Sequence, residues 1–223
     1  MKNTKKAKYS IMIVTIISCI IMAFIEIVIE PSYVIKSAAK AVIFLLLPVI
    51  SMKLLNMEVF GHSFLLNKKT IMKLLLLGFL IYIVIIVAYF LTRNIFDYPS
   101  LVNSLSTDQK VNSGSFIWVA LYISFCNSFL EEFMFRFFSF IKLSDYTTRS
   151  VTYILSAVLF AVYHIAMIGT AFPLPLLILA LIGLSIGGII FDYVDEKNKN
   201  IYNSWIIHMF ADFAIMTIWY IHI

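Results

Sequence analysis

Two adjacent carboxylates and an arginine lie inside an apolar stretch of the sequence, residues 116–140. The stretch is long enough to cross a bilayer as a helix, where an ionised side chain is costly unless it faces a partner or a wet cavity. Glu132 and Arg136 are four residues apart and can pair on one helix face, which leaves Glu131 as a free carboxylate. All three could instead form buried structural pairs, but ionisable residues within a membrane more often mark a functional site.

The residues before the carboxylates predict a polar stripe on this helix. Ser124, Asn127, Ser128 and Glu131 fall within an arc of about 100° when successive residues are spaced by the angle of an α-helix. We therefore expect Asn127 to lie beside Glu131.

Later apolar stretches carry two histidines and an aspartate. His164 lies within residues 151–169, and His208 and Asp212 lie one helical turn apart, so both face the same neighbour. A single buried histidine is more often a core residue than a catalyst. Two histidines from separate spans, with Asp212 and Glu131 also needing partners away from lipid, predict a shared polar cavity.

This set of side chains suits hydrolysis of an acyl bond. A carboxylate held away from bulk water can take a proton from water, an imidazole can hold that water, and the remaining donors can stabilise an oxyanion. No serine or cysteine lies in a recognisable nucleophile motif, so direct attack by water is favoured. We expect no required cofactor. Zinc bound by Glu131, His164 and His208 stays open as an alternative, although no HExxH motif is present.

The composition indicates the elements that must position these groups. With 62% hydrophobic and 13% charged residues, the chain is a polytopic membrane protein rather than a soluble domain. We predict an all-α fold of about seven transmembrane helices in one bundle. The apolar stretches are residues 9–29, 38–55, 71–91, 116–140, 151–169, 174–191 and 205–221. The first is longer than the apolar part of a signal peptide, which favours a retained signal-anchor helix.

The positive charges predict the orientation. All but four of the 17 lysines and arginines lie at ends that are cytoplasmic if the N-terminus is cytoplasmic, and the C-terminus is then extracytoplasmic. The four assigned to the other side are Lys36, Lys40, Arg93 and Lys110. Because the basic residues are spread over the ends of spans, they give no sign of a nucleic-acid partner.

We predict a single membrane domain, residues 1–223, in which residues 1–92 are scaffold helices and residues 116–221 are the catalytic core. The polar residues 92–115 between them are expected to form a flexible extracytoplasmic linker. Glu26, near the end of the first span, is expected to extend to the interface.

Small residues predict where helices approach closely. Gly183 and Gly187 have the small-xxx-small spacing that admits a neighbouring helix.

Three short motifs together resemble one protein family. Glu131 to Arg136 matches EExxxR, Phe160 to His164 matches FxxxH, and His208 to Asp212 matches HxxxN/D, in that order on successive spans. This pattern, which covers roughly residues 116–221, is similar to the CPBP family (Abi, or CAAX protease and bacteriocin-processing family) of intramembrane endopeptidases, related to the type II CAAX prenyl endopeptidase.

The resemblance implies a glutamate-dependent endopeptidase that cuts near the cytoplasmic surface, with membrane lipids and a peptide or protein substrate as partners. It implies that Glu131 and His164 activate water and that His208 and Asp212 stabilise the oxyanion. Glu132 and Arg136 would support the site, with Arg136 in reach of a substrate carboxylate. It also implies a bacterial plasma membrane and a role in peptide processing or bacteriocin self-immunity.

Two details refine these roles. The family often has Asn where this chain has Asp212, and an ionised carboxylate would repel an oxyanion. Asp212 is therefore either protonated by burial or orients and charges His208, and we predict the second. Counting the rise per residue from the cytoplasmic ends places His164 about two turns deeper than Glu131 or His208. A span that begins outside the membrane would remove this difference; otherwise His164 is a core residue and the water is held by other groups.

Two other classes of function stay open. A non-catalytic immunity or scaffold protein could keep the same fold, and a proton-coupled transporter could use Glu and His side chains as a relay. The sequence shows no inverted repeat, which disfavours transport.

Overall fold

The computed structural model describes residues 2–59, 62–64 and 68–223, which form helices and short connections and include no strand. Seven of the described helices are long and apolar enough to cross a membrane. They are Thr4–Ile29, Tyr33–Leu54, Thr70–Thr92, Phe116–Lys142, Arg149–Ile168, Leu174–Glu196 and Tyr202–His222. The all-α fold and the seven spans are thus confirmed, and the chain is an integral membrane protein.

Several spans combine α-helical and π-helical segments. In chain order the elements are α1 (Lys2–Phe24), η1 (Ile25–Ile29), α2 (Tyr33–Ala41), η2 (Val42–Leu46), α3 (Leu47–Leu54), η3 (His62–Phe64), α4 (Lys68–Thr92), α5 (Tyr98–Asp108), α6 (Phe116–Leu121), η4 (Tyr122–Asn127), α7 (Ser128–Glu131), η5 (Glu132–Lys142), α8 (Arg149–Tyr163), α9 (Ile165–Ile168), α10 (Leu174–Glu196) and α11 (Tyr202–His222).

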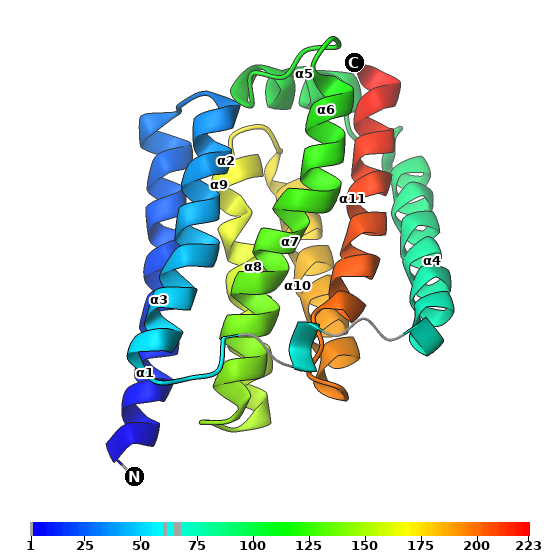
Figure 1. Ribbon diagram of the computed structural model, residues 1–223. Coiled ribbons are helices and arrows are strands. Elements are labelled where there is room, and N and C mark those ends of the chain that lie inside the picture. The colour runs from blue at the N-terminus through cyan, green and yellow to red at the C-terminus, as the bar shows by residue number, and fades with distance from the viewer. Residues whose placement is uncertain (1, 60–61, 65–67) are drawn as a thin grey trace.

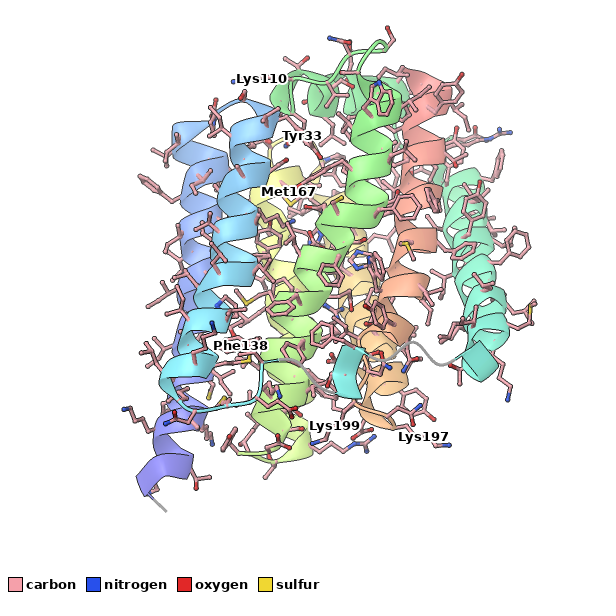
Figure 2. All side chains as sticks on the ribbon, viewed as in Figure 1. Tyr33, Lys110, Phe138, Met167, Lys197 and Lys199 are labelled. Carbon is pink, nitrogen blue, oxygen red and sulfur yellow. The ribbon has the colours of Figure 1, made fainter. Side chains whose placement is uncertain are left out.

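The long helices run side by side, and α5 lies across the end of the bundle where the C-terminus is found (Figure 1). The N-terminus lies at the opposite end. Lys110 lies at the α5 end, whereas Lys197 and Lys199 lie at the other end (Figure 2). The two termini are thus on opposite sides of the bundle, and which side faces the cytoplasm stays a prediction.

The connection at residues 92–115 is not the flexible linker that its polar composition suggested. Residues 98–108 form α5, whose Leu101 and Val102 are buried. Trp219 of α11 donates a hydrogen bond from Nε1 to Ser106 Oγ at 2.9 Å. The polar composition was misleading because α5 is amphipathic and buries only one face.

The core of the bundle is built around η5. Five phenylalanines of this segment are buried, and aromatic rings from η2, η3 and α8 pack on them. They are Phe133, Phe135, Phe137, Phe138 and Phe140. Glu131, the last residue of α7, and Glu132, the first residue of η5, lie beside this aromatic core and are buried with it.

The close approach expected at Gly183 and Gly187 is found elsewhere. A Cβ at either of these glycines would meet no atom within 4 Å, whereas one at Gly188 would lie 2.9 Å from Ala157 Cα. The prediction therefore chose the right helix, α10, and the wrong face of it.

Glu26 does not extend to the interface as expected. Its side chain is 8% exposed and its carboxylate lies 2.6 Å from the ammonium of Lys36 on α2. A buried partner removes the reason for a charged side chain to reach for water.

Candidate active site

The carboxylate of Glu131 is not free, because Lys40 binds it. Lys40 Nζ donates to Glu131 Oε1 at 2.5 Å and to Asn127 Oδ1 at 2.5 Å. Asn127 Nδ2 also donates to Glu131 Oε1, at 3.1 Å, so two donors hold the same oxygen. Asn127 thus lies beside Glu131, as the polar stripe predicted, and the pairing of Glu131 corrects the prediction of a free carboxylate.

The local helix geometry sets Glu131 apart from its neighbours. Glu131 ends α7, a single α-helical turn between the π-helical segments η4 and η5. Such wide turns are frequent at functional sites, because they change which side chains share a helix face.

The second oxygen of Glu131 faces two imidazoles from separate spans. Oε2 lies 3.8 Å from His164 Nε2 and 3.7 Å from His208 Nε2. His164 is therefore level with Glu131 and not two turns deeper, so counting residues from the ends of the spans does not give the relative depth of these side chains. The structure thus brings Glu131, His164 and His208 together.

The His164 ring is oriented by its own helix. His164 Nδ1 lies 2.7 Å from the carbonyl oxygen of Phe160, where α8 is ending. A carbonyl can only accept, so Nδ1 carries the proton and Nε2, the nitrogen facing Glu131, is an acceptor in the neutral ring. The FxxxH spacing therefore fixes which nitrogen points into the site.

Glu132, not Asp212, makes the short contact to His208. Glu132 Oε1 accepts from His208 Nδ1 at 2.7 Å, whereas Asp212 Oδ1 lies 3.7 Å from Nε2. The ring of Phe191 stacks on His208, with centroids 5.1 Å apart. Asp212 was expected to orient His208. The hydrogen bond shows that Glu132 does so, and Asp212 instead faces the same nitrogen as Glu131.

Arg136 is enclosed by protein and cannot reach a substrate carboxylate. The residue is 0% exposed, and its guanidinium carbon lies 4.1 Å from the ring centre of Phe160 and 4.9 Å from that of Phe191. Its Nε lies 3.5 Å from Glu132 Oε2, the pairing that their spacing predicted, and 3.8 Å from Asp192 Oδ1. Arg136 therefore supports Glu132 from behind, and the idea of substrate contact is wrong.

Three ionisable groups near the site were missed by sequence reasoning. Lys40 was assigned to the outer end of its span, because the apolar stretch begins at residue 38, whereas the helix itself begins at Tyr33. Asp192, which accepts from Ser156 Oγ at 2.8 Å, and Asp195, which accepts from Ser204 N at 2.9 Å, follow an apolar stretch that ends at residue 191. In each case hydropathy ended the span before the helix ended.

The residues considered for zinc do not form a ligand set. Among the residues that the structure describes, no group of three or more His, Cys, Asp or Glu side chains could hold a metal ion. The ammonium of Lys40 at Glu131 also places a positive charge where a cation would bind.

Comparison with known proteins identifies a family for the region that carries Glu131, His164, His208 and Asp212. Residues 113–214 match a family model described as Type II CAAX prenyl endopeptidase Rce1-like. No curated protein and no solved structure matches the chain.

Proposed function

We propose that the chain hydrolyses a peptide bond within the membrane, because residues 113–214 match the Rce1-like family model of type II CAAX prenyl endopeptidases, in agreement with the family that the three motifs resemble. The match supports an intramembrane protease of the CAAX type.

One observation carries the proposal. Glu131 Oε2 lies within 3.8 Å of the Nε2 atoms of both His164 and His208. These separations exceed a direct hydrogen bond and suit one water molecule that contacts all three groups. We infer that this water is the nucleophile.

The proposed reaction proceeds by proton transfer through Glu131. Glu131 takes a proton from the water, with His164 Nε2 accepting the other hydrogen bond, while the water oxygen attacks the substrate carbonyl carbon. When the carbon–nitrogen bond breaks, the protonated Glu131 returns that proton to the leaving amine. Water is thus divided between the new carboxyl group and the new amine.

His208 is proposed to stabilise the oxyanion. Because Glu132 accepts from Nδ1, a protonated His208 presents its Nε2 hydrogen to the developing negative charge. Asp212, 3.7 Å from the same nitrogen, stabilises the imidazolium through its charge. This division gives Asp212 an indirect role and explains how a carboxylate is tolerated where the family often has an amide.

The cellular setting is proposed from the resemblance and the charges. We infer a bacterial plasma membrane, an N-terminus in the cytoplasm, and cleavage of a peptide near the cytoplasmic surface during peptide processing or bacteriocin self-immunity. Whether the substrate is prenylated is an outcome of the substrate test below.

A non-catalytic immunity protein is the second candidate, because Lys40 already occupies one oxygen of Glu131. A purified sample, incubated with a library of quenched prenylated and unprenylated peptides, separates the two. Cleavage that Glu131→Gln abolishes supports the peptidase. Protection of cells against a toxic peptide that survives Glu131→Gln, without any cleavage, supports the binding protein.

A further inference from the structure

The ammonium of Lys40 is the cation nearest the proposed general base, and it comes from a helix outside the matched residues 113–214. We propose that Lys40 is a positioning residue of the active site, which holds Glu131 Oε1 so that Oε2 is presented to water and the two histidines. This inference rests on the proposed peptidase function and assigns part of the site to the N-terminal helices.

The first support is that Lys40 is held in place from several sides. The residue is 4% exposed, and Nζ lies 5.4 Å from the ring centre of Phe44 and 5.1 Å from that of Tyr163. Two of its three protons are donated, one to Glu131 and one to Asn127. An ammonium enclosed in this way by two aromatic faces and two oxygens has one orientation, so it can fix the carboxylate that it binds.

The second support is the division of labour between the two oxygens of Glu131. Oε1 accepts from Lys40 and Asn127, both at hydrogen-bond distance. Oε2 is the oxygen that faces His164 and His208. Rotation of the carboxylate would exchange the two oxygens, and the two donors on Oε1 oppose that rotation.

The third support is the position of the ion pair within the bundle. Lys40 lies on α2 and Glu131 at the end of α7, 91 residues apart in sequence, so the contact joins the N-terminal helices to the family domain. A partner that only neutralised the charge of Glu131 could come from within the domain. A partner from α2 ties the position of Glu131 to that helix as well.

The test measures peptide cleavage by full-length Lys40→Met and Lys40→Gln in detergent. Loss of the fixed orientation is expected to lower kcat about 100-fold in Lys40→Met with KM unchanged within twofold, since misplacement of a catalytic group by about 1 Å has an effect of that size. Lys40→Gln, which keeps an N–H donor group and loses the charge, is expected to lower kcat about tenfold. Lys40→Arg, which keeps the charge and N–H donors, is expected to lower kcat less than Lys40→Met does.

Lys36→Met is the matched control, because Lys36 is buried one turn earlier on the same helix and pairs with Glu26 instead. It is expected to change kcat less than threefold. If Lys40→Met does not fold, Lys40→Gln and Lys40→Arg carry the test.

Wild-type kcat in Lys40→Gln and Lys40→Met, or equal losses in the Lys36 and Lys40 variants, would overturn the positioning role. The proposed function would still hold if cleavage depended on Glu131. A wild-type protein without Glu131-dependent cleavage would overturn both.

Discussion

Two buried ion pairs on α2, one helical turn apart, have nearly the same local geometry and different surroundings. Lys36 lies 2.6 Å from Glu26, and Lys40 lies 2.5 Å from Glu131. All four side chains are under 10% exposed. The Glu26 pair has a further amide contact, from Lys36 to Gln109, the residue that follows α5, at 3.4 Å. The Glu131 pair faces two imidazoles.

The two ion pairs neutralise charge in the same way and differ in the side chains that surround them. Both pairs form for the same reason, because a charged side chain within the membrane is costly unless an opposite charge lies beside it. At Glu131 the second carboxylate oxygen faces two imidazoles, which can exchange protons. Burial and pairing alone therefore do not identify a catalytic carboxylate, and the second oxygen is the feature to examine.

The largest difference in kcat is expected when the carboxylate of each pair is replaced. Glu131→Gln removes the proposed base and is expected to lower kcat at least 1000-fold, toward the upper range for general acid–base catalysis. Glu26→Gln is expected to change kcat less than threefold. Cleavage rates of the two variants, measured on the same quenched peptide, make the comparison. Similar rates for both would show that Glu131 is a structural partner like Glu26.

Hydropathy and spacing were sufficient to predict the fold and the convergence of motifs. Each span is apolar enough to be found by composition, and Glu131, His164 and His208 are recognisable because they interrupt apolar stretches. The contact between Lys40 and Glu131 could not be predicted in this way. It depends on how α2 is placed against α7, and a lysine near the end of an apolar stretch is ordinarily read as a topology signal.

The sequence only partly predicted which residues contact His208, again because the contact depends on how two helices pack. Spacing places His208 and Asp212 on one face of α11, and it cannot say that Glu132 reaches Nδ1 first. The i,i+4 rule describes neighbours on one helix, whereas the hydrogen bond to His208 joins two helices.

The second-largest loss of kcat is expected from replacing Glu132, which orients His208. Glu132→Gln keeps an oxygen that can accept from Nδ1 and removes the negative charge, so the imidazolium is less well stabilised. We expect kcat to fall about 10- to 100-fold with KM unchanged, which places Glu132 between Glu131 and Glu26 in importance. Initial rates over a range of peptide concentrations, with wild-type protein as reference, measure kcat and KM. A change in KM alone would indicate a substrate contact instead.

Asp212→Asn is expected to have a smaller effect. Asp212 acts on His208 only through its charge at 3.7 Å, and an amide at the same position can still donate to an oxyanion. We expect measurable cleavage, within about tenfold of the wild type, where Glu131→Gln shows none. Equal loss in Asp212→Asn and Glu131→Gln would assign Asp212 a direct part in the reaction.

The smallest effect is expected when both members of the outer pair are replaced together. Lys36→Met alone leaves Glu26 buried without its cation, and breaking a buried pair in this way costs about 3–5 kcal/mol of unfolding free energy. Lys36→Met with Glu26→Gln removes both charges, and such replacements are often nearly neutral, so we expect a change within about 1 kcal/mol. Unfolding in mixed micelles, followed by tryptophan fluorescence, measures both variants. The same double replacement at Lys40 and Glu131 should also fold, yet it should abolish cleavage, because there the carboxylate serves the reaction as well as the ion pair.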